Sequence, residues 1–158
     1  MSKICTILVG VPGSGKSTWL EQHYDDETAW FMSTDDIIQD IADMYGMTYS
    51  EAFPDLIKFA DKVMWQDFES SARRGVHIYV DRTNMSVKSR RRFIDRLKPY
   101  GYKFEAVVFP IPDADEWKRR ISSRPGKIIP EHVLQSMAGS YVEPTEAEGF
   151  SKITFMTN

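Results

Sequence analysis

Cysteine is nearly absent from this chain, since Cys5 is the one cysteine among 158 residues. A single thiol cannot form an internal disulfide, so the sequence excludes a disulfide-stapled domain and indicates a reducing setting such as the cytoplasm. Long apolar runs are missing too. The N-terminal stretch ICTILV is too short for a signal peptide or a membrane span, so we expect a cytoplasmic protein without a membrane partner.

An excess of positive charge is also missing, because the formal net charge is -3. Attraction of the whole molecule to nucleic acid is therefore not indicated, and any nucleic-acid site has to be a local basic patch. Repeats, low-complexity tracts and obvious linkers do not occur. The hydrophobic content of 42% is ordinary for a globular protein, and we expect one domain over residues 1–158.

Short apolar segments alternate with segments of helical periodicity along the chain. Strands are predicted at residues 4–10, 29–33, 76–81, 103–111 and 152–156. Helices are predicted at residues 16–24, 34–46, 53–74, 86–101, 113–123 and 130–141. This order predicts an α/β fold with a central parallel sheet of about five strands and helices on both faces. Ligands of such sheets bind beyond the carboxyl ends of the strands.

A glycine-rich stretch, GVPGSGKST from Gly10 to Thr18, joins the first predicted strand to the first predicted helix. Its spacing is the Walker A pattern, whose backbone N–H groups and helix N-terminus hold phosphates. We predict that Lys16 reaches the terminal phosphates of ATP and that the Ser17 hydroxyl binds Mg²⁺. The predicted ATP-binding residues of the loop are Gly13, Ser14, Gly15, Lys16, Ser17 and Thr18. A tight structural turn is the simpler alternative. The lack of an Asn-Lys-x-Asp motif argues against a GTPase.

Two carboxylates, Asp35 and Asp36, follow the second predicted strand in the stretch FMSTDD. A kinase needs a base that accepts the proton of the incoming hydroxyl, and a carboxylate at this strand end can supply it. Asp35 is the better candidate because it is nearer the strand end. The alternative is structural, since acidic residues in a first turn stabilise a helix and Thr34 or Asp35 can serve as its cap.

The third strand ends in a second acidic loop, DRTN, from Asp81 to Asn84. Asp81 is predicted to help organise Mg²⁺, although aspartate also favours ordinary turns. Thr83 and Asn84 either hold the loop or contact the acceptor substrate, and Arg82, Asp35 and Asp36 are also expected to contact it.

Basic residues are concentrated in two places. The stretch KRRISSRPGK falls where a lid over the nucleotide is expected, at about residues 118–130, and we favour Arg120 and Arg124 as the arginines that neutralise the phosphoryl group. The run from Lys88 to Arg92 follows the DRTN loop and is interpreted as solvated surface charge.

In this order, the stretches GVPGSGKSTWL, TDD, DRTN with SRRRF, the arginine-rich lid and EPTEAEGFSKI together resemble the 5′-kinase domain of polynucleotide kinases. The resemblance covers nearly the whole chain. It implies a P-loop kinase fold and transfer of the γ-phosphate of ATP, with Mg²⁺, to the 5′-hydroxyl of DNA or RNA. It further implies that Lys16 and Ser17 hold phosphates and Mg²⁺, that Asp35 is the general base, and that Arg124 is the lid arginine.

The sequence departs from this pattern at the acceptor side. The phage enzyme has an arginine three residues after its base, where this chain has Ile38, and the residue before the base, often arginine in the family, is Thr34. Arg82 is a candidate substitute. Other acceptors therefore stay open: a hydroxymethylated base in DNA or a small metabolite such as a nucleoside or sugar. A non-catalytic nucleotide-binding module is a further alternative. We expect no phosphatase domain and no phosphatase activity.

Overall fold

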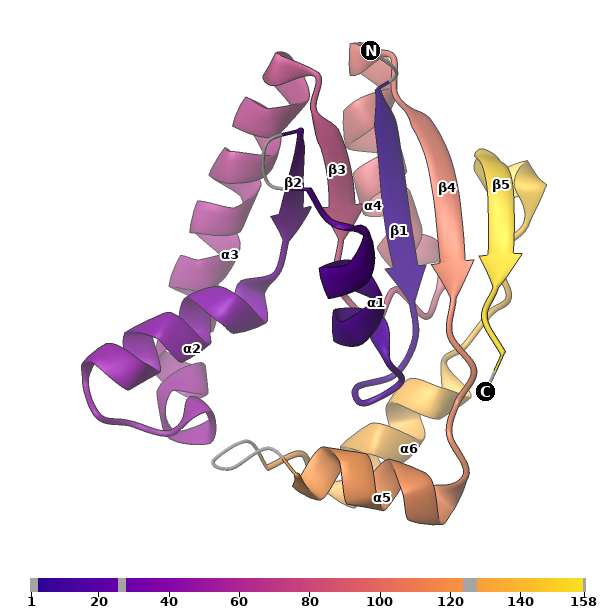
Figure 1. Ribbon diagram of the computed structural model, residues 1–158. Helices are drawn as coiled ribbons and strands as arrows, with labels where there is room; N and C mark the ends of the chain where they lie inside the picture. The colour runs from indigo at the N-terminus through magenta and orange to yellow at the C-terminus, as the bar shows by residue number, and fades with distance from the viewer. Residues whose placement is uncertain (1–2, 26–27, 124–127, 158) are drawn as a thin grey trace.

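A single parallel sheet of five strands lies at the centre of the computed structural model, which describes residues 3–25, 28–123 and 128–157 (Figure 1). The strand order is β2-β3-β1-β4-β5. The strands are β1 (Ile4–Val9), β2 (Ala29–Met32), β3 (His77–Val80), β4 (Lys103–Val108) and β5 (Phe150–Phe155). The predicted fold class is confirmed, and each predicted strand is present.

Helices cover both faces of this sheet, with α1 in front of it and α4 behind it in the view of Figure 1. The α-helices are α1 (Lys16–His23), α2 (Thr34–Met44), α3 (Tyr49–Arg74), α4 (Val87–Leu97), α5 (Ala114–Ser122) and α6 (Glu131–Gly139). Two short 3₁₀ turns are η1 (Lys98–Tyr100) and η2 (Glu146–Glu148). α3 begins four residues before its predicted start, because Thr48 and Glu51 form a capping box.

The main core lies between the sheet and the helices behind it. The central strand β1 is buried over most of its length, and Ile7 and Val9 pack with Phe68 of α3 and Phe93 of α4. A second, smaller core joins α2 to α3 around Ile38, which is fully buried. Packing of α2 against α3 therefore fixes the start of α2 beside the carboxyl edge of the sheet.

The expectation that residues 88–92 are surface charge is wrong for Arg90. Its side chain is 0% exposed and forms a forked ion pair with Glu148, with Nε–Oε1 2.8 Å and Nη2–Oε2 3.0 Å. Nη1 donates to the carbonyl of Asn84 at 2.9 Å. The neighbours Arg91 and Arg92 are exposed as expected. Within the described ranges, no helix is long and apolar enough to span a bilayer.

Candidate active site

The glycine-rich loop forms an open turn between β1 and α1. Gly13 and Gly15 have φ of 77° and 103°, in the left-handed region that favours glycine. Gly15 is the N-cap of α1, whose first turn contains no acidic residue. A helix leaves its first N–H groups without intrahelical acceptors, so this end is suited to an anion. The loop has the backbone that the Walker A pattern predicts.

Lys16 is buried at the base of this loop. Its Nζ donates to the carbonyls of Gly10 and Val11, at 2.7 and 2.9 Å. These bonds hold the ammonium group against the loop, and the residue also lines the neighbouring cleft. A cation in this position is placed to exchange a carbonyl for a phosphate oxygen.

The two carboxylates that follow β2 lie in the first turn of α2. The N-cap of α2 is Ser33, so the alternative that Thr34 or Asp35 is the cap is wrong. Asp35 accepts a hydrogen bond from the hydroxyl of Tyr49, at 2.5 Å. Tyr49 is the first residue of α3, is 6% exposed and stacks obliquely on Phe53. The small α2–α3 core thus orients the Asp35 side chain.

The DRTN loop is fastened to the first strand by its own last residue. Asn84 is buried, has a φ of 49°, and donates from Nδ2 to the carbonyl of Leu8 at 2.8 Å. The N–H of Gly10 donates to the carbonyl of Thr83 at 3.0 Å. Of the two roles considered for Asn84, these contacts match the one that holds the loop.

Arg82 of the same loop extends toward α3. Its Nη2 lies 2.6 Å from Oδ1 of Asp61, and the two side chains are 24% and 42% exposed. Because the pair is partly solvated, its main effect is to fix the direction of the guanidinium rather than to stabilise the fold.

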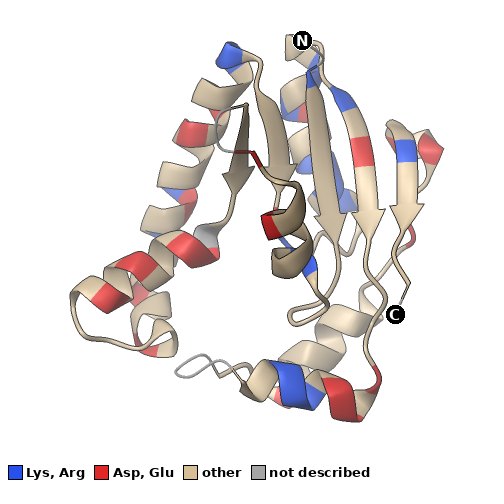
Figure 2. Cartoon of the chain, viewed as in Figure 1, with Lys and Arg blue, Asp and Glu red and all other residues tan. Residues whose placement is uncertain are grey.

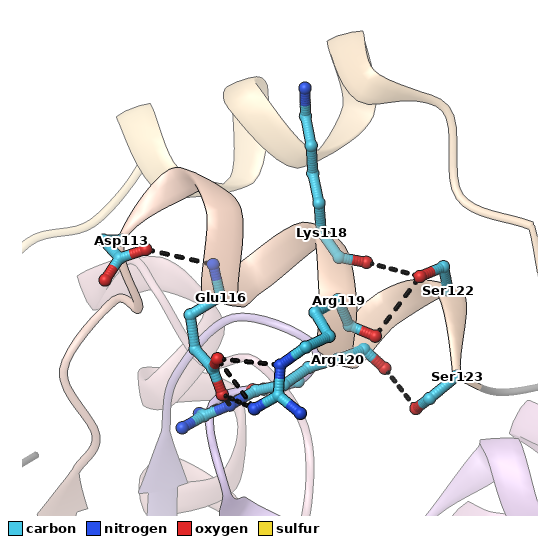
Figure 3. Close-up of polar contacts among 8 residues, drawn as sticks. Asp113, Glu116, Lys118, Arg119, Arg120, Ser122 and Ser123 are labelled. Carbon is cyan, nitrogen blue, oxygen red and sulfur yellow. Dashed lines mark hydrogen bonds and ion pairs between the residues drawn. The ribbon is translucent and has the colours of Figure 1, made fainter.

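Helix α5 closes the site on the side opposite α2. The indole N–H of Trp117 donates to the carbonyl of Pro12 at 2.6 Å, and Arg120 Nη1 donates to the carbonyl of Gly13 at 3.1 Å. Figure 3 shows the side chains of Arg119 and Arg120 converging on Glu116. Hydrogen bonds from Arg119 and then Arg120 lower the pKa of the Glu116 carboxyl. Arg124, the predicted lid arginine, lies outside the described residues, as does Lys127.

These pieces surround one cleft of about 910 Å³ at the carboxyl edge of the sheet. Predicted residues that line it are Gly13, Ser14, Gly15, Lys16, Ser17, Thr18, Asp35, Asp36, Asp81, Arg82, Thr83 and Arg120. Figure 2 shows acidic residues on α2 and residues of both signs on α5, on either side of the glycine-rich loop. The structure thus brings together all the described candidate residues except Asn84.

The donor set is suited to Mg²⁺ bound together with a nucleotide. Ser17 and Asp81, whose side chains carry oxygen atoms, both line the cleft. Among the described residues, no three His, Cys, Asp or Glu side chains form a metal site of their own. Mg²⁺ commonly takes one or two protein oxygens and completes its coordination shell with phosphates and water. Two protein residues, Ser17 and Asp81, are therefore enough to hold Mg²⁺ beside a bound nucleotide.

A family comparison decides the classification. The AAA domain family AAA_33 matches residues 6–144. The chain belongs to this family. Heterogeneous nuclear ribonucleoprotein U-like protein 2 of Mus musculus is 23% identical to this chain. The alignment covers 94% of this chain and 21% of that relative. The chain therefore spans about a fifth of the length of this curated protein.

Solved structures share the fold of this AAA domain. A putative kinase from Chloroflexus aurantiacus superposes with a TM-score of 0.71 at 15% identity, covering 98% of the chain and 89% of that structure. A chain of the Pnkp1/Rnl/Hen1 RNA repair complex superposes with a TM-score of 0.63 at 22% identity. The superposition covers 89% of this chain and 44% of that one. The fold is that of the P-loop kinases, and the family implies nucleotide binding.

Sequence reasoning missed the residues that orient the site of this AAA domain. Glu116 had a local signal, because it lies three and four residues before Arg119 and Arg120. Tyr49 and Asp61 had none, since each meets its partner only when α3 packs beside α2 and the DRTN loop.

Proposed function

We propose that this AAA domain is an ATP- and Mg²⁺-dependent kinase that phosphorylates a hydroxyl of nucleic acid, at the 5′ end of a DNA or RNA strand. The observation that carries the proposal is the convergence of the phosphate loop, Asp35 and Arg82 in one cleft. Phosphoryl transfer requires mainly positioning and charge neutralisation, and this cleft supplies groups for both.

The nucleotide side is formed by the loop and α5. The loop N–H groups and Lys16 hold the phosphates, and Arg120 lies against the loop carbonyl of Gly13. Ser17 and Asp81 would hold Mg²⁺, which supplies charge neutralisation at the phosphates when it is bound. Arg124 is proposed, on the resemblance alone, to complete this cluster.

The acceptor side is formed by α2 and the DRTN loop. Asp35 accepts the proton of the acceptor hydroxyl. The oxygen of that hydroxyl bonds to the γ-phosphorus of ATP, and the bond between this phosphorus and the oxygen of the ADP leaving group breaks. Tyr49 keeps the carboxylate in place through its hydroxyl. Asp36 and Thr83 line the same region of the cleft and are proposed to contact the acceptor.

A nucleic-acid acceptor is supported by a cation that lines the same cleft as Asp35. Ile38, which stands where the phage enzyme has an arginine, is fully buried in the α2–α3 core and cannot contact an acceptor. Arg82 instead lines the cleft, and Asp61 of α3 holds its guanidinium. A phosphate next to the reacting nucleotide would supply the matching negative charge. The order of motifs shared with polynucleotide kinases points to the same acceptor.

A labelled-phosphate panel tests the acceptor. γ-Labelled ATP is offered with 5′-hydroxyl oligonucleotides, duplex DNA containing hydroxymethylated bases, nucleosides and sugars. We expect label on the 5′ end of oligonucleotides. Label only on nucleosides or sugars, or on modified bases, would replace the proposed acceptor while leaving the kinase chemistry intact.

Asp35→Asn tests the mechanism. We expect turnover to fall by about 10²- to 10⁴-fold, the usual contribution of a general base, with ATP affinity nearly unchanged. Asp40→Asn is the matched control, because Asp40 is an exposed carboxylate of the same helix. Lys16→Ala is expected to abolish transfer. Wild-type turnover in Asp35→Asn would show that Asp35 is not the base.

A further inference from the structure

A second hollow lies outside the candidate active site, in the seam between α3 and α4. It has a volume of about 590 Å³ and shares no lining residue with the cleft. Its lining consists of Lys62, Trp65, Gln66, Glu69, Arg73 and Arg96. Three of these six side chains are cations, which is unexpected in a chain whose net charge is -3.

Trp65 is the centre of the seam. One of its contacts is with the core, where its ring stacks on Phe93 at 5.4 Å between centroids. The guanidinium carbons of Arg96 and Arg92 lie 3.9 and 5.4 Å from the centroid of the same indole. The core holds the ring rigid, and the ring in turn orders two arginines whose flexible chains would otherwise lose entropy on binding an anion.

The charge of the seam is not cancelled locally. Among the residues that the structure describes, Lys62, Arg73 and Arg92 take part in no ion pair. The contact of Arg96 with Glu69 is 4.0 Å long and solvent-exposed, so it is weak. α4 also exposes Lys88 and Arg91 and carries one acidic residue, Asp95. The face therefore has a net positive charge at its surface.

The seam leads directly from the acceptor side of the cleft. Arg82, which lines the cleft, is bonded to Asp61 of α3, and Lys62 is the next residue. α4 starts at Val87, three residues after the DRTN loop, and runs away from the cleft behind the sheet (Figure 1). From Lys62 to Arg73 the helix rises about 16 Å, the length of several phosphates at one charge per ~3.4 Å of a strand.

We propose that the α3–α4 seam is a second nucleic-acid contact, which binds backbone phosphates of the substrate strand beyond the nucleotide that is phosphorylated. Lys62, Arg73, Arg92 and Arg96 bind the phosphates, and Trp65 keeps the two α4 arginines in place. This inference rests on the proposed function, because it assumes that the acceptor is a strand. A strand suits the seam better than a compact anion, since the cations are distributed along two helices rather than gathered at one point.

The test is the double variant Arg92→Gln/Arg96→Gln, compared with Lys103→Gln/Lys152→Gln. The control removes two exposed positive charges from β4 and β5. Binding of a fluorescent 5′-hydroxyl 20-mer is measured by anisotropy without ATP, over a salt series. We expect the seam variant to bind the 20-mer at least about tenfold more weakly than the wild type. The slope of log K against log salt should become shallower by about 1.4, because two phosphate contacts are lost at ~0.7 each. Both variants should unfold at the wild-type midpoint.

Kinetics separate this inference from the proposed function. With a dinucleotide acceptor, which is too short to reach the seam, the seam variant should keep wild-type kcat and KM, and only KM for the 20-mer should rise. Seam and control variants that bind the 20-mer equally well would overturn the inference while leaving the kinase proposal untouched. Displacement of the 20-mer by poly-glutamate of equal charge as readily as by unlabelled 20-mer would also overturn it. Seam-dependent binding without phosphorylation of any oligonucleotide would support the seam and refute the proposed oligonucleotide acceptor.

Discussion

Substitution of Glu148 by Gln should destabilise this AAA domain by about 3–5 kcal/mol, because Arg90 would keep its charge without a buried counter-charge. The side chains of Arg90 and Glu148 are 0% and 8% exposed. The guanidinium makes two hydrogen bonds to the carboxylate and one to the carbonyl of Asn84. Gln can accept one of the two bonds but carries no charge, so most of the desolvation penalty is left uncompensated.

The expected loss is a large share of the 5–15 kcal/mol that holds a typical domain together. Equilibrium unfolding in denaturant measures it, with Glu146→Gln as the control, since Glu146 is an exposed carboxylate of the same 3₁₀ turn and should change stability by less than about 0.5 kcal/mol. The double variant Arg90→Met/Glu148→Leu removes both charges and should recover most of the loss. A cost below about 1 kcal/mol for Glu148→Gln would refute the reasoning, because it would mean that water reaches the guanidinium.

Three further predictions concern single positions. Tyr49→Phe should lower kcat about tenfold in single-turnover assays, the equivalent of one hydrogen bond to a charged group, and leave ATP affinity unchanged; an unaltered kcat would reduce Tyr49 to a packing role. Burial lowers the pKa of His77 below 6.5, so the folded state resists protonation and stability should fall as the pH drops through and below 6.5. In thermal unfolding between pH 7.5 and 5, the stability of His77→Gln should fall less with decreasing pH than that of the wild type. An equally steep fall in the variant would mean that another group causes the pH dependence. Gly15→Ala places a Cβ no closer than 4.0 Å to Phe109, so its cost is the left-handed backbone, about 1–2 kcal/mol. Calorimetry should show weaker ATP binding, and wild-type affinity would mean that the loop does not grip phosphate.

The fold was predictable from sequence because its signals are local. An apolar strand precedes the glycine-rich loop and a helix follows it, Ser86 caps α4, and Gly75 ends α3. The cleft was predictable for a related reason. Parallel strands end at one edge of the sheet, so Asp35 and Asp81, which each follow a strand, had to lie near the loop between β1 and α1.

The contacts that orient the site were not predictable, because they join residues far apart in sequence. Arg90 lies in a basic run, and nothing local indicates that Glu148, 58 positions away, meets it in the core. Asp35 and Tyr49 belong to different helices, and their contact depends on how α2 packs on α3. The role of Arg124 stays a prediction.

The bond from Arg90 to Asn84 also sets an order for biosynthesis. Asn84 has left-handed backbone, is held by the carbonyl of Leu8, and is braced by an arginine whose own counter-charge is Glu148. Until Glu148 has been synthesised, the Arg90 guanidinium lacks the anion with which it pairs in the folded core. The nascent chain is then expected to expose an immature DRTN loop, although β1, β3 and α4 precede Glu148 in the chain and are synthesised first.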